Sequence, residues 1–223
     1  MEGDYKKIVP ALIKKGIDNI NLSMFSDDVR KKLLNAAGDE YFKKGLMPEA
    51  IKAFSMAQNG PKLIEVGDYF IGIEMYHKAI DSYKLANNKQ KLMKVGEKAL
   101  KEGKISEAIK AFKICEDTEK LKEVGEYCFK SEKFRFALEI YDALGNKDKI
   151  NLIGDLFLER NQLEDAAQAY ELSGNKDRLN KLGDALFKEG IVPAALKCYE
   201  ASENETMVKF IKENFEKEDR IYI

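Results

Sequence analysis

Apolar positions recur along this chain at a spacing typical of helices. They are arranged around six glycines that follow one another at intervals of 29 residues: Gly38, Gly67, Gly96, Gly125, Gly154 and Gly183. Leucine or isoleucine lies four residues before each glycine, and further apolar residues follow three and four residues after it. Offsets of three and four share one helix face. This pattern predicts a first helix from about six residues before each glycine to about six after it.

A second helix is predicted after a short turn. Alanine lies twelve residues after each glycine, at Ala50, Ala79, Ala108, Ala137, Ala166 and Ala195. An aromatic residue follows four positions later, at Phe54, Tyr83, Phe112, Tyr141, Tyr170 and Tyr199. Residues four apart lie on one helix face. Pro48 and Pro193 lie where the second helix starts, a position that tolerates proline.

The ends of the second helices are predicted by glycine and aspartate. Gly145 and Gly174 suit a left-handed residue that closes a helix. Asp148 and Asp177 follow shortly after and are expected to cap the next first helix. Loops this short join antiparallel neighbours, so the chain reads as a stack of helix pairs with no strands.

The glycine in mid-helix needs a physical reason, because it costs roughly 1 kcal/mol relative to alanine. Close approach of the two helices supplies one. We expect the first helix to pack against the second where the alanine column lies, since only small residues permit such contact.

The pattern of leucine, glycine, aromatic, alanine and aromatic resembles the tetratricopeptide repeat (TPR). The similarity covers residues 32–206 as six units, and Gly45, Gly103 and Gly190 match the family's second, weaker glycine. The family's unit has about 34 residues and a closing proline, whereas these units are shorter and lack that proline. The resemblance implies an all-α fold, a right-handed α-solenoid of antiparallel helix pairs.

Both ends differ from the six units. Residues 1–31 are predicted to form a degraded first unit, with Asn21 in place of the alanine. The residues that keep its register are Tyr5, Val9, Leu12, Gly16 and Phe25. Residues 207–223 are expected to form a capping helix, over 207–218, and a tail. Terminal units of such arrays need a polar outer face.

Charge and composition exclude several classes of function. The net charge is −1 and the pI is near 6.1, so the chain lacks the basic surface that nucleic acid or an anionic membrane requires. We find no signal-peptide pattern and no run of about 18 apolar residues. Cys115, Cys128 and Cys198 have no paired spacing and read as free thiols, which favours a cytoplasmic location.

Catalytic and metal-binding motifs are not found in the sequence. His77 is the only histidine and has no predicted nucleophile or carboxylate beside it, so we expect it to be exposed to solvent. The dispersed cysteines are expected in small core positions. We therefore predict a protein that is not an enzyme and binds no cofactor or metal.

One column of acidic residues is a candidate binding surface. It lies one residue past each glycine: Asp39, Asp68, Glu97, Glu126, Asp155 and Asp184. In the TPR family this position faces the concave groove, so the resemblance implies a row of carboxylates that suits a basic partner. The alternative is a solvated face paired internally, with lysine four residues later as in Asp39–Lys43, or with basic residues six positions before each acid.

A second candidate is the apolar row four residues past each glycine, which includes Phe42, Phe129 and Phe187. It predicts either packing between successive first helices or a partly exposed apolar floor. We therefore expect an interaction scaffold whose groove holds a basic or amphipathic segment of another protein. The alternative is a structural module that assembles with itself, as a homo-oligomer, or within a larger complex.

Overall fold

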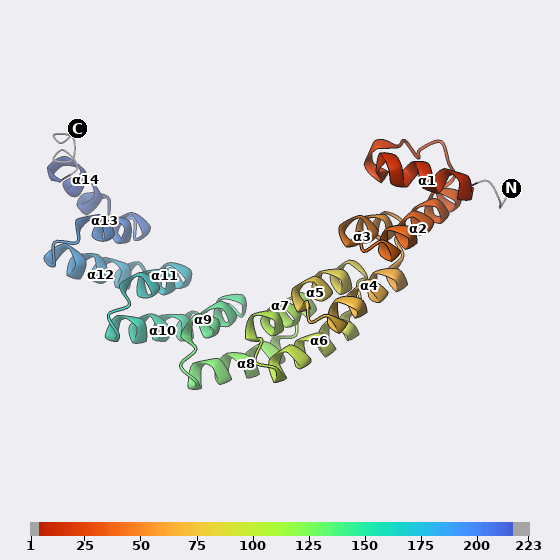
Figure 1. Cartoon of the computed structure of the whole chain (residues 1–223). Helices are drawn as coiled ribbons and strands as arrows, with labels where there is room; N and C mark the ends of the chain where they lie inside the picture. Colours follow the sequence, from red (N-terminus) through yellow and green to blue (C-terminus); the bar gives the residue numbers. More distant parts are fainter. Residues whose placement is uncertain (1–4, 216–223) are drawn as a thin grey trace. The chain divides into compact units, whose positions relative to one another are not determined.

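The computed structural model describes residues 5–215, in which all the regular secondary structure is helical (Figure 1). These residues form fourteen α-helices and one 3-10 helix and contain no strand. The helices are α1 (Tyr5–Lys15), η1 (Ile17–Asn19), α2 (Asp27–Lys43), α3 (Met47–Met56), α4 (Gly60–Gly72), α5 (Tyr76–Leu85), α6 (Lys89–Lys101), α7 (Ile105–Cys115), α8 (Thr118–Lys130), α9 (Phe134–Ala143), α10 (Lys147–Glu159), α11 (Leu163–Ser173), α12 (Lys176–Lys188), α13 (Val192–Ala201) and α14 (Glu205–Asn214). The predicted all-α fold is confirmed.

The chain divides into two compact units, residues 1–117 and 118–223. Within the first unit the pairs are α2 with α3, α4 with α5, and α6 with α7. Within the second they are α8 with α9, α10 with α11, and α12 with α13. The first helix of each pair contains the glycine, and the second contains the alanine and the aromatic residue. Each unit is thus a helical repeat array in which neighbours in sequence are neighbours in space.

The six glycines lie against the aromatic column, one helical turn past the alanine column that the prediction named. A Cβ added at Gly38 would lie 2.5 Å from Cε1 of Phe54, and one at Gly154 would lie 2.5 Å from Cε1 of Tyr170. Real side chains do not approach this closely, so the ring needs the space that glycine leaves. Close approach is confirmed as the reason for the glycines, because the ring crosses the first helix at that point.

The alanine column lies at the centre of each pair and is fully buried, as are the leucine and aromatic columns around it. Alanine keeps the two helix backbones close, while the aromatic ring of the same helix fills the space beside the glycine. Small and large residues therefore alternate along the second helix, which is how helix surfaces interdigitate.

Every turn between these helices contains a residue in the left-handed conformation. Gly145 and Gly174 have φ of 66° and 70°, as their sequence pattern predicted. Other turns place a larger residue there, for example Glu132 with φ of 57° and Asn161 with φ of 56°. The turn geometry is thus kept even where glycine is absent, at a conformational cost to the larger side chain.

Asparagine caps four of the first helices, α4, α6, α10 and α12, and Ser26 caps α2, so the predicted caps Asp148 and Asp177 were wrong. Asn146 accepts a hydrogen bond from the backbone N–H of Lys149 at 3.1 Å, and Asn175 accepts one from Arg178 at 3.1 Å. Asp148 and Asp177 lie two residues later, inside the first turn. There they favour the helix through its dipole instead.

The two ends depart from the paired pattern in different ways. The degraded first unit forms its first helix, α1, but residues 20–26 form no second helix. Asn21 stands at the alanine position and accepts a hydrogen bond from the N–H of Ser23, which favours a turn. The predicted capping helix is α14, which begins at Glu205 and ends at Asn214 instead of spanning residues 207–218. Residues 216–218 of the predicted range lie outside the described residues.

Candidate protein-binding site

The acidic column forms bridges between successive helix pairs. Asp68, one residue past Gly67 on α4, accepts a hydrogen bond of 2.6 Å from the hydroxyl of Tyr83 on α5. Lys91 Nζ, from the first turn of α6, lies 2.6 Å from the same carboxylate. We call Asp68, Tyr83 and Lys91 the Asp68 cluster.

The second unit repeats this arrangement twice. In the Glu126 cluster, Tyr141 donates to Glu126 at 2.8 Å and Lys149 Nζ lies 3.1 Å from its carboxylate. In the Asp155 cluster, Tyr170 donates at 2.9 Å and an Arg178 nitrogen lies 3.0 Å from the carboxylate. Each cluster therefore joins both helices of one pair to the first turn of the next first helix.

Hydrogen bonding keeps these groups in opposite protonation states. The hydrogen bond from Tyr141, followed by that from Lys149, lowers the pKa of Glu126. Burial opposes ionisation of Asp68, but its hydrogen bonds from Lys91 and Tyr83 outweigh that effect and lower its pKa. Burial and the hydrogen bond to the carboxylate raise the pKa of Tyr83 and of Tyr141. Glu126 and Asp68 therefore stay ionised acceptors, and Tyr83 and Tyr141 stay donors, at neutral pH.

The contacts support the internally paired alternative for much of this column. Asp39 pairs with Lys62 at 2.9 Å, in the same geometry but with Phe54 in place of a tyrosine. The column carboxylates thus form ion pairs with basic residues of the next first helix. The predicted pair with the lysine four residues later is not formed by Asp39, because Lys43 contacts Glu40 instead. Asp184 differs from the others: it accepts a hydrogen bond from Tyr199 at 2.7 Å, and no cation contacts it among residues 5–215.

The apolar row is divided between packing and exposure. Phe42, Phe129 and Phe187 are half-buried, and Leu158 in the same row is exposed. Phe42 contacts Tyr69 of the next first helix edge to face, with ring centroids 5.7 Å apart. The row thus packs successive first helices together and leaves part of each side chain accessible.

Exposed apolar side chains lie near this aromatic contact in sequence. Leu46, Tyr69 and Ile73 are 42%, 43% and 45% exposed, which is unusual for large apolar side chains. Phe42 and Tyr69 lie in the last turns of α2 and α4, Leu46 lies in the turn that follows α2, and Ile73 is the residue directly after α4. We call Phe42, Leu46, Tyr69 and Ile73 the α2–α4 patch.

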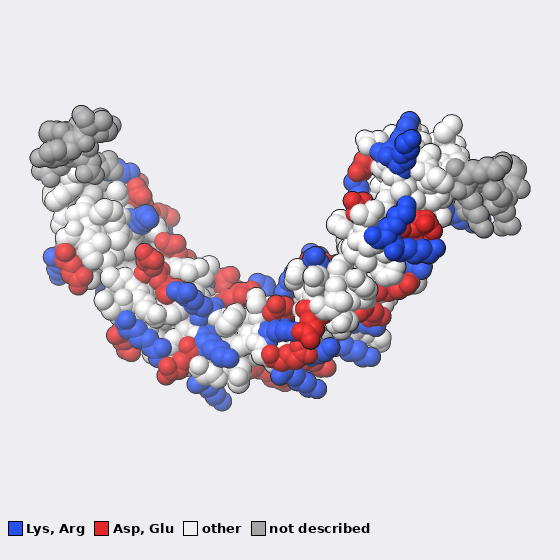
Figure 2. All heavy atoms as spheres, viewed as in Figure 1, with Lys and Arg blue, Asp and Glu red and all other residues white. Residues whose placement is uncertain are grey.

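Charged side chains of both signs are interspersed on the face shown in Figure 2, between areas of uncharged residues. Many of them form ion pairs between successive helix pairs, such as Lys110 with Asp81 at 2.7 Å and Arg135 with Asp165 at 2.9 Å. Such exposed pairs contribute little stability individually. They do, however, neutralise charge locally on the surface.

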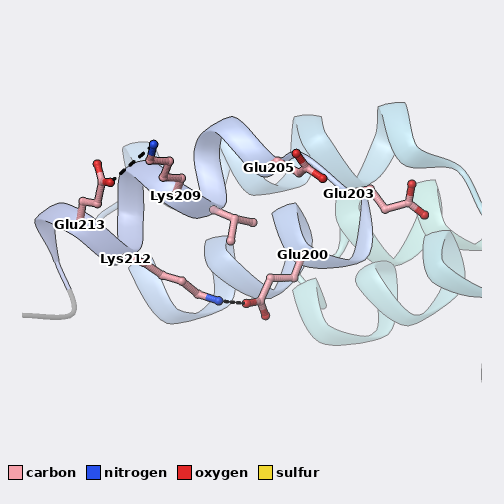
Figure 3. A pocket seen from close by; sticks show the side chains of 7 residues that line it. Glu200, Glu203, Glu205, Lys209, Lys212 and Glu213 are labelled. Atoms are coloured by element: carbon pink, nitrogen blue, oxygen red, sulfur yellow. Dashed lines mark hydrogen bonds and ion pairs between the residues drawn. The ribbon is translucent and has the colours of Figure 1, made fainter.

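A hollow of about 500 Å³ lies on α14 at the end of the second unit (Figure 3). It is lined by the aliphatic side chain of Val208 and by charged residues, and Lys212 forms an ion pair of 2.7 Å with Glu200. Lys212 occupies the register of the column glycine. The six helix pairs have glycine at this register, where the aromatic ring of the second helix approaches closely, so Lys212 departs from the pairing pattern.

The residues that carry reactive chemistry lie apart from one another. His77 is exposed in the first turn of α5, as predicted. Cys115 is half-buried and Cys128 and Cys198 are buried, all as free thiols, and burial raises the pKa of each. Among the described residues, no three histidine, cysteine or acidic side chains are grouped so as to hold a metal ion.

Among the solved structures that match this chain, two illustrate how low the similarity is. No protein-family model matches the chain. No curated protein matches it. A crystal structure of MamA protein covers 84% of this chain and 96% of its own, at 16% identity and a TM-score of 0.27. A circular tandem repeat protein with novel repeat topology and enhanced subunit contact surfaces covers 89% and 43%, at 14% identity and a TM-score of 0.15. Values this low assign neither a family nor a partner.

Within residues 5–215, no helix combines the length and the apolar character needed to cross a membrane.

A set of asparagines that the sequence analysis did not select also joins successive pairs. Asn175 caps α12 and its amide donates to Asn151 of α10 at 3.1 Å, while Asn204 donates to Asn180 at 2.8 Å. Ser173 donates to Asn151 at 2.9 Å. The recurrence of asparagine three residues before a glycine, at Asn35, Asn151 and Asn180, was the signal that could have identified them.

Proposed function

We propose that the chain is a non-catalytic scaffold of shortened TPR-like helix pairs that holds a peptide or helix of a partner protein in a groove along its first helices. The observation that carries this proposal is the α2–α4 patch, with Tyr69 and Ile73 exposed beside the half-buried Phe42. Contiguous exposed apolar surface on a soluble chain marks interaction sites. A cytoplasmic location is consistent with the free thiols.

The proposed surface uses the partly exposed aromatic residues as its floor. Phe42, Phe129 and Phe187 each leave part of the ring accessible on a first helix. The carboxylates of Asp39, Asp68, Glu97, Glu126, Asp155 and Asp184 border this floor in the proposal. Several of these carboxylates already form ion pairs with lysine or arginine of the next first helix, so we assign them the role of joining successive helix pairs. Asp184 is the carboxylate that we assign to a basic partner.

Self-assembly in which a second copy adds a further helix pair after α14 is less well supported. Phe210 and Phe215 are exposed there and would favour association. Lys212, however, stands where a further second helix would need glycine, so another pair cannot be added in the same geometry.

A photo-crosslinker placed at Tyr69 tests the scaffold function. We expect it to capture a defined protein from lysate, whereas a crosslinker at Lys98, the same register of the next first helix, captures much less. Ile73→Glu should abolish capture at Tyr69 because a charge disrupts the patch. Equal capture at both positions, or capture that survives Ile73→Glu, would exclude the patch as a docking surface.

A further inference from the structure

The chain contains its own example of how this surface binds a cation. In the Glu126 cluster, Lys149 Nζ lies 3.1 Å from the Glu126 carboxylate. It also lies 4.9 Å from the ring centroid of Phe129 and 5.7 Å from that of Tyr141. One carboxylate and two aromatic rings therefore surround the ammonium, a combination that stabilises lysine by charge and by cation–π attraction.

The same three groups recur at the end of the second unit without the cation. Asp184 corresponds to Glu126, Phe187 to Phe129 and Tyr199 to Tyr141. Tyr199 donates to Asp184 at 2.7 Å, so the carboxylate is held in the same way. Met207 occupies the position of Lys149, and a thioether cannot neutralise the carboxylate.

Exposed aromatic surface lies directly beside this incomplete cluster. Phe187 contacts Phe210 and Phe215, with centroid distances of 6.2 and 5.5 Å. Phe210 is 45% exposed and Phe215 is 39% exposed. A partner residue that neutralised Asp184 would therefore bring its neighbours onto an apolar surface.

We propose that Asp184, Tyr199 and Phe187 form a recognition site for a lysine or arginine side chain of a partner protein, with an adjacent apolar residue of that partner covering Phe210 and Phe215. The inference rests on the scaffold function and assigns the partner's chemistry. The partner's cation takes the place that Lys149 takes in the Glu126 cluster, where its charge meets the carboxylate and its stem lies along the ring. The Asp184 carboxylate disfavours a phosphate-bearing ligand such as nucleic acid.

Substitution of Met207 provides a sharp test, because lysine at this position would complete the cluster from within the chain. The probe is a blocked peptide of sequence Gly-Ile-Lys-Phe-Gly, titrated into the labelled full chain and followed by NMR. We expect shifts at Asp184, Phe187 and Tyr199. The same peptide with norleucine in place of lysine should bind about tenfold more weakly, which corresponds to loss of one charge-assisted contact.

Three variants distinguish specific binding of a cation at Asp184 from nonspecific binding of the peptide. Asp184→Asn and Met207→Lys should each weaken binding of the lysine peptide by about tenfold, the first by removing the charge and the second by occupying the site. Met207→Leu keeps the bulk without the charge and should bind as the wild type does. Unchanged backbone spectra away from the site would show that each variant is folded.

Equal binding of both peptides, or equal binding by Met207→Lys and Met207→Leu, would overturn the assignment. Dimerisation of the wild type that is lost in Met207→Lys would assign the site to a second copy and would also overturn it. Because the α2–α4 patch is tested separately by crosslinking at Tyr69, failure of the Asp184 site leaves that test of the scaffold function intact.

Discussion

The helix pairs α8–α9 and α10–α11 follow one sequence pattern, yet the tyrosine ring approaches the glycine more closely in α10–α11 than in α8–α9. A Cβ on Gly154 would lie 2.5 Å from the Tyr170 ring, whereas one on Gly125 would lie 3.3 Å from the Tyr141 ring. In α9 the residue before the tyrosine is Ile140, where α11 has Ala169. The larger side chain lies between the helices, so the difference shows that one neighbouring position sets how closely the ring approaches.

The largest effect should come from removing that side chain. Ile140→Ala is expected to cost about 2–4 kcal/mol in the free energy of unfolding, because Ile140 is fully buried and its loss leaves a cavity. Urea denaturation of the full chain measures the loss. Ile140→Val is the control and should cost about 0.5–1.5 kcal/mol. A loss below that of the valine variant would show that α9 closes onto α8.

Alanine substitutions at the two glycines test how closely each tyrosine ring approaches. Gly154→Ala should destabilise the chain by about 1–2 kcal/mol, since displacement of the Tyr170 ring outweighs the helix propensity that alanine gains. Gly125→Ala should change stability by less than about 0.5 kcal/mol, because the Cγ2 methyl of Ile140 at 3.0 Å and the Tyr141 ring at 3.3 Å need to move only slightly, and alanine gains helix propensity in return. Melts that rank the two variants in the opposite order would contradict the account of the aromatic column.

The turns of the same two pairs differ in the residue that adopts the left-handed conformation. Glu132→Gly should stabilise the chain by about 0.5–1 kcal/mol, because glutamate is strained at its φ of 57°. Asn161→Gly should gain less than about 0.5 kcal/mol, because asparagine tolerates that region better. Thermal melts compare the two; an equal gain would mean that turn strain does not depend on the side chain.

The smallest effect concerns pH at the Glu126 cluster. The folded-state pKa of Glu126 lies below the unfolded value, so its contribution is present above about pH 4.3 and is lost as pH falls through the folded pKa. Because the side chain is 46% exposed, that contribution should be only about 0.5 kcal/mol.

Comparing wild type with Glu126→Gln in urea between pH 7 and pH 3 measures this term. The two curves should converge at the acidic end, where the carboxylate is protonated. A stability difference that stays constant over the whole range would show that charge at Glu126 is not involved.

Sequence alone predicted the helix pairs because apolar spacing fixes which side of each helix is buried. The helix bounds, the buried alanine column and the left-handed glycines at Gly145 and Gly174 followed from that spacing and from turn chemistry. The choice between Asn146 and Asp148 as a cap did not, because both residue types cap helices well and they lie two positions apart.

The candidate site was less predictable, because it depends on contacts between helices that are distant in sequence. The column of carboxylates was visible, but the tyrosine fifteen residues away and the base of the next pair meet Glu126 only after three helices have packed. Periodicity places a residue on a face and does not state which side chain of another helix reaches it. Phe210 and Phe215 likewise showed their exposure only once α14 had been positioned.

The asparagine caps tie helix formation to attachment between neighbours. Asn175 both starts α12 and bonds to Asn151 on α10, so loss of its side chain would fray one helix and release it from the previous pair in a single step. Local opening at such a junction is therefore expected to spread to the adjoining pair, which makes unfolding cooperative over more than one pair. Cooperative unfolding along the array then depends on the polar side chains that join successive helix pairs as well as on the apolar core.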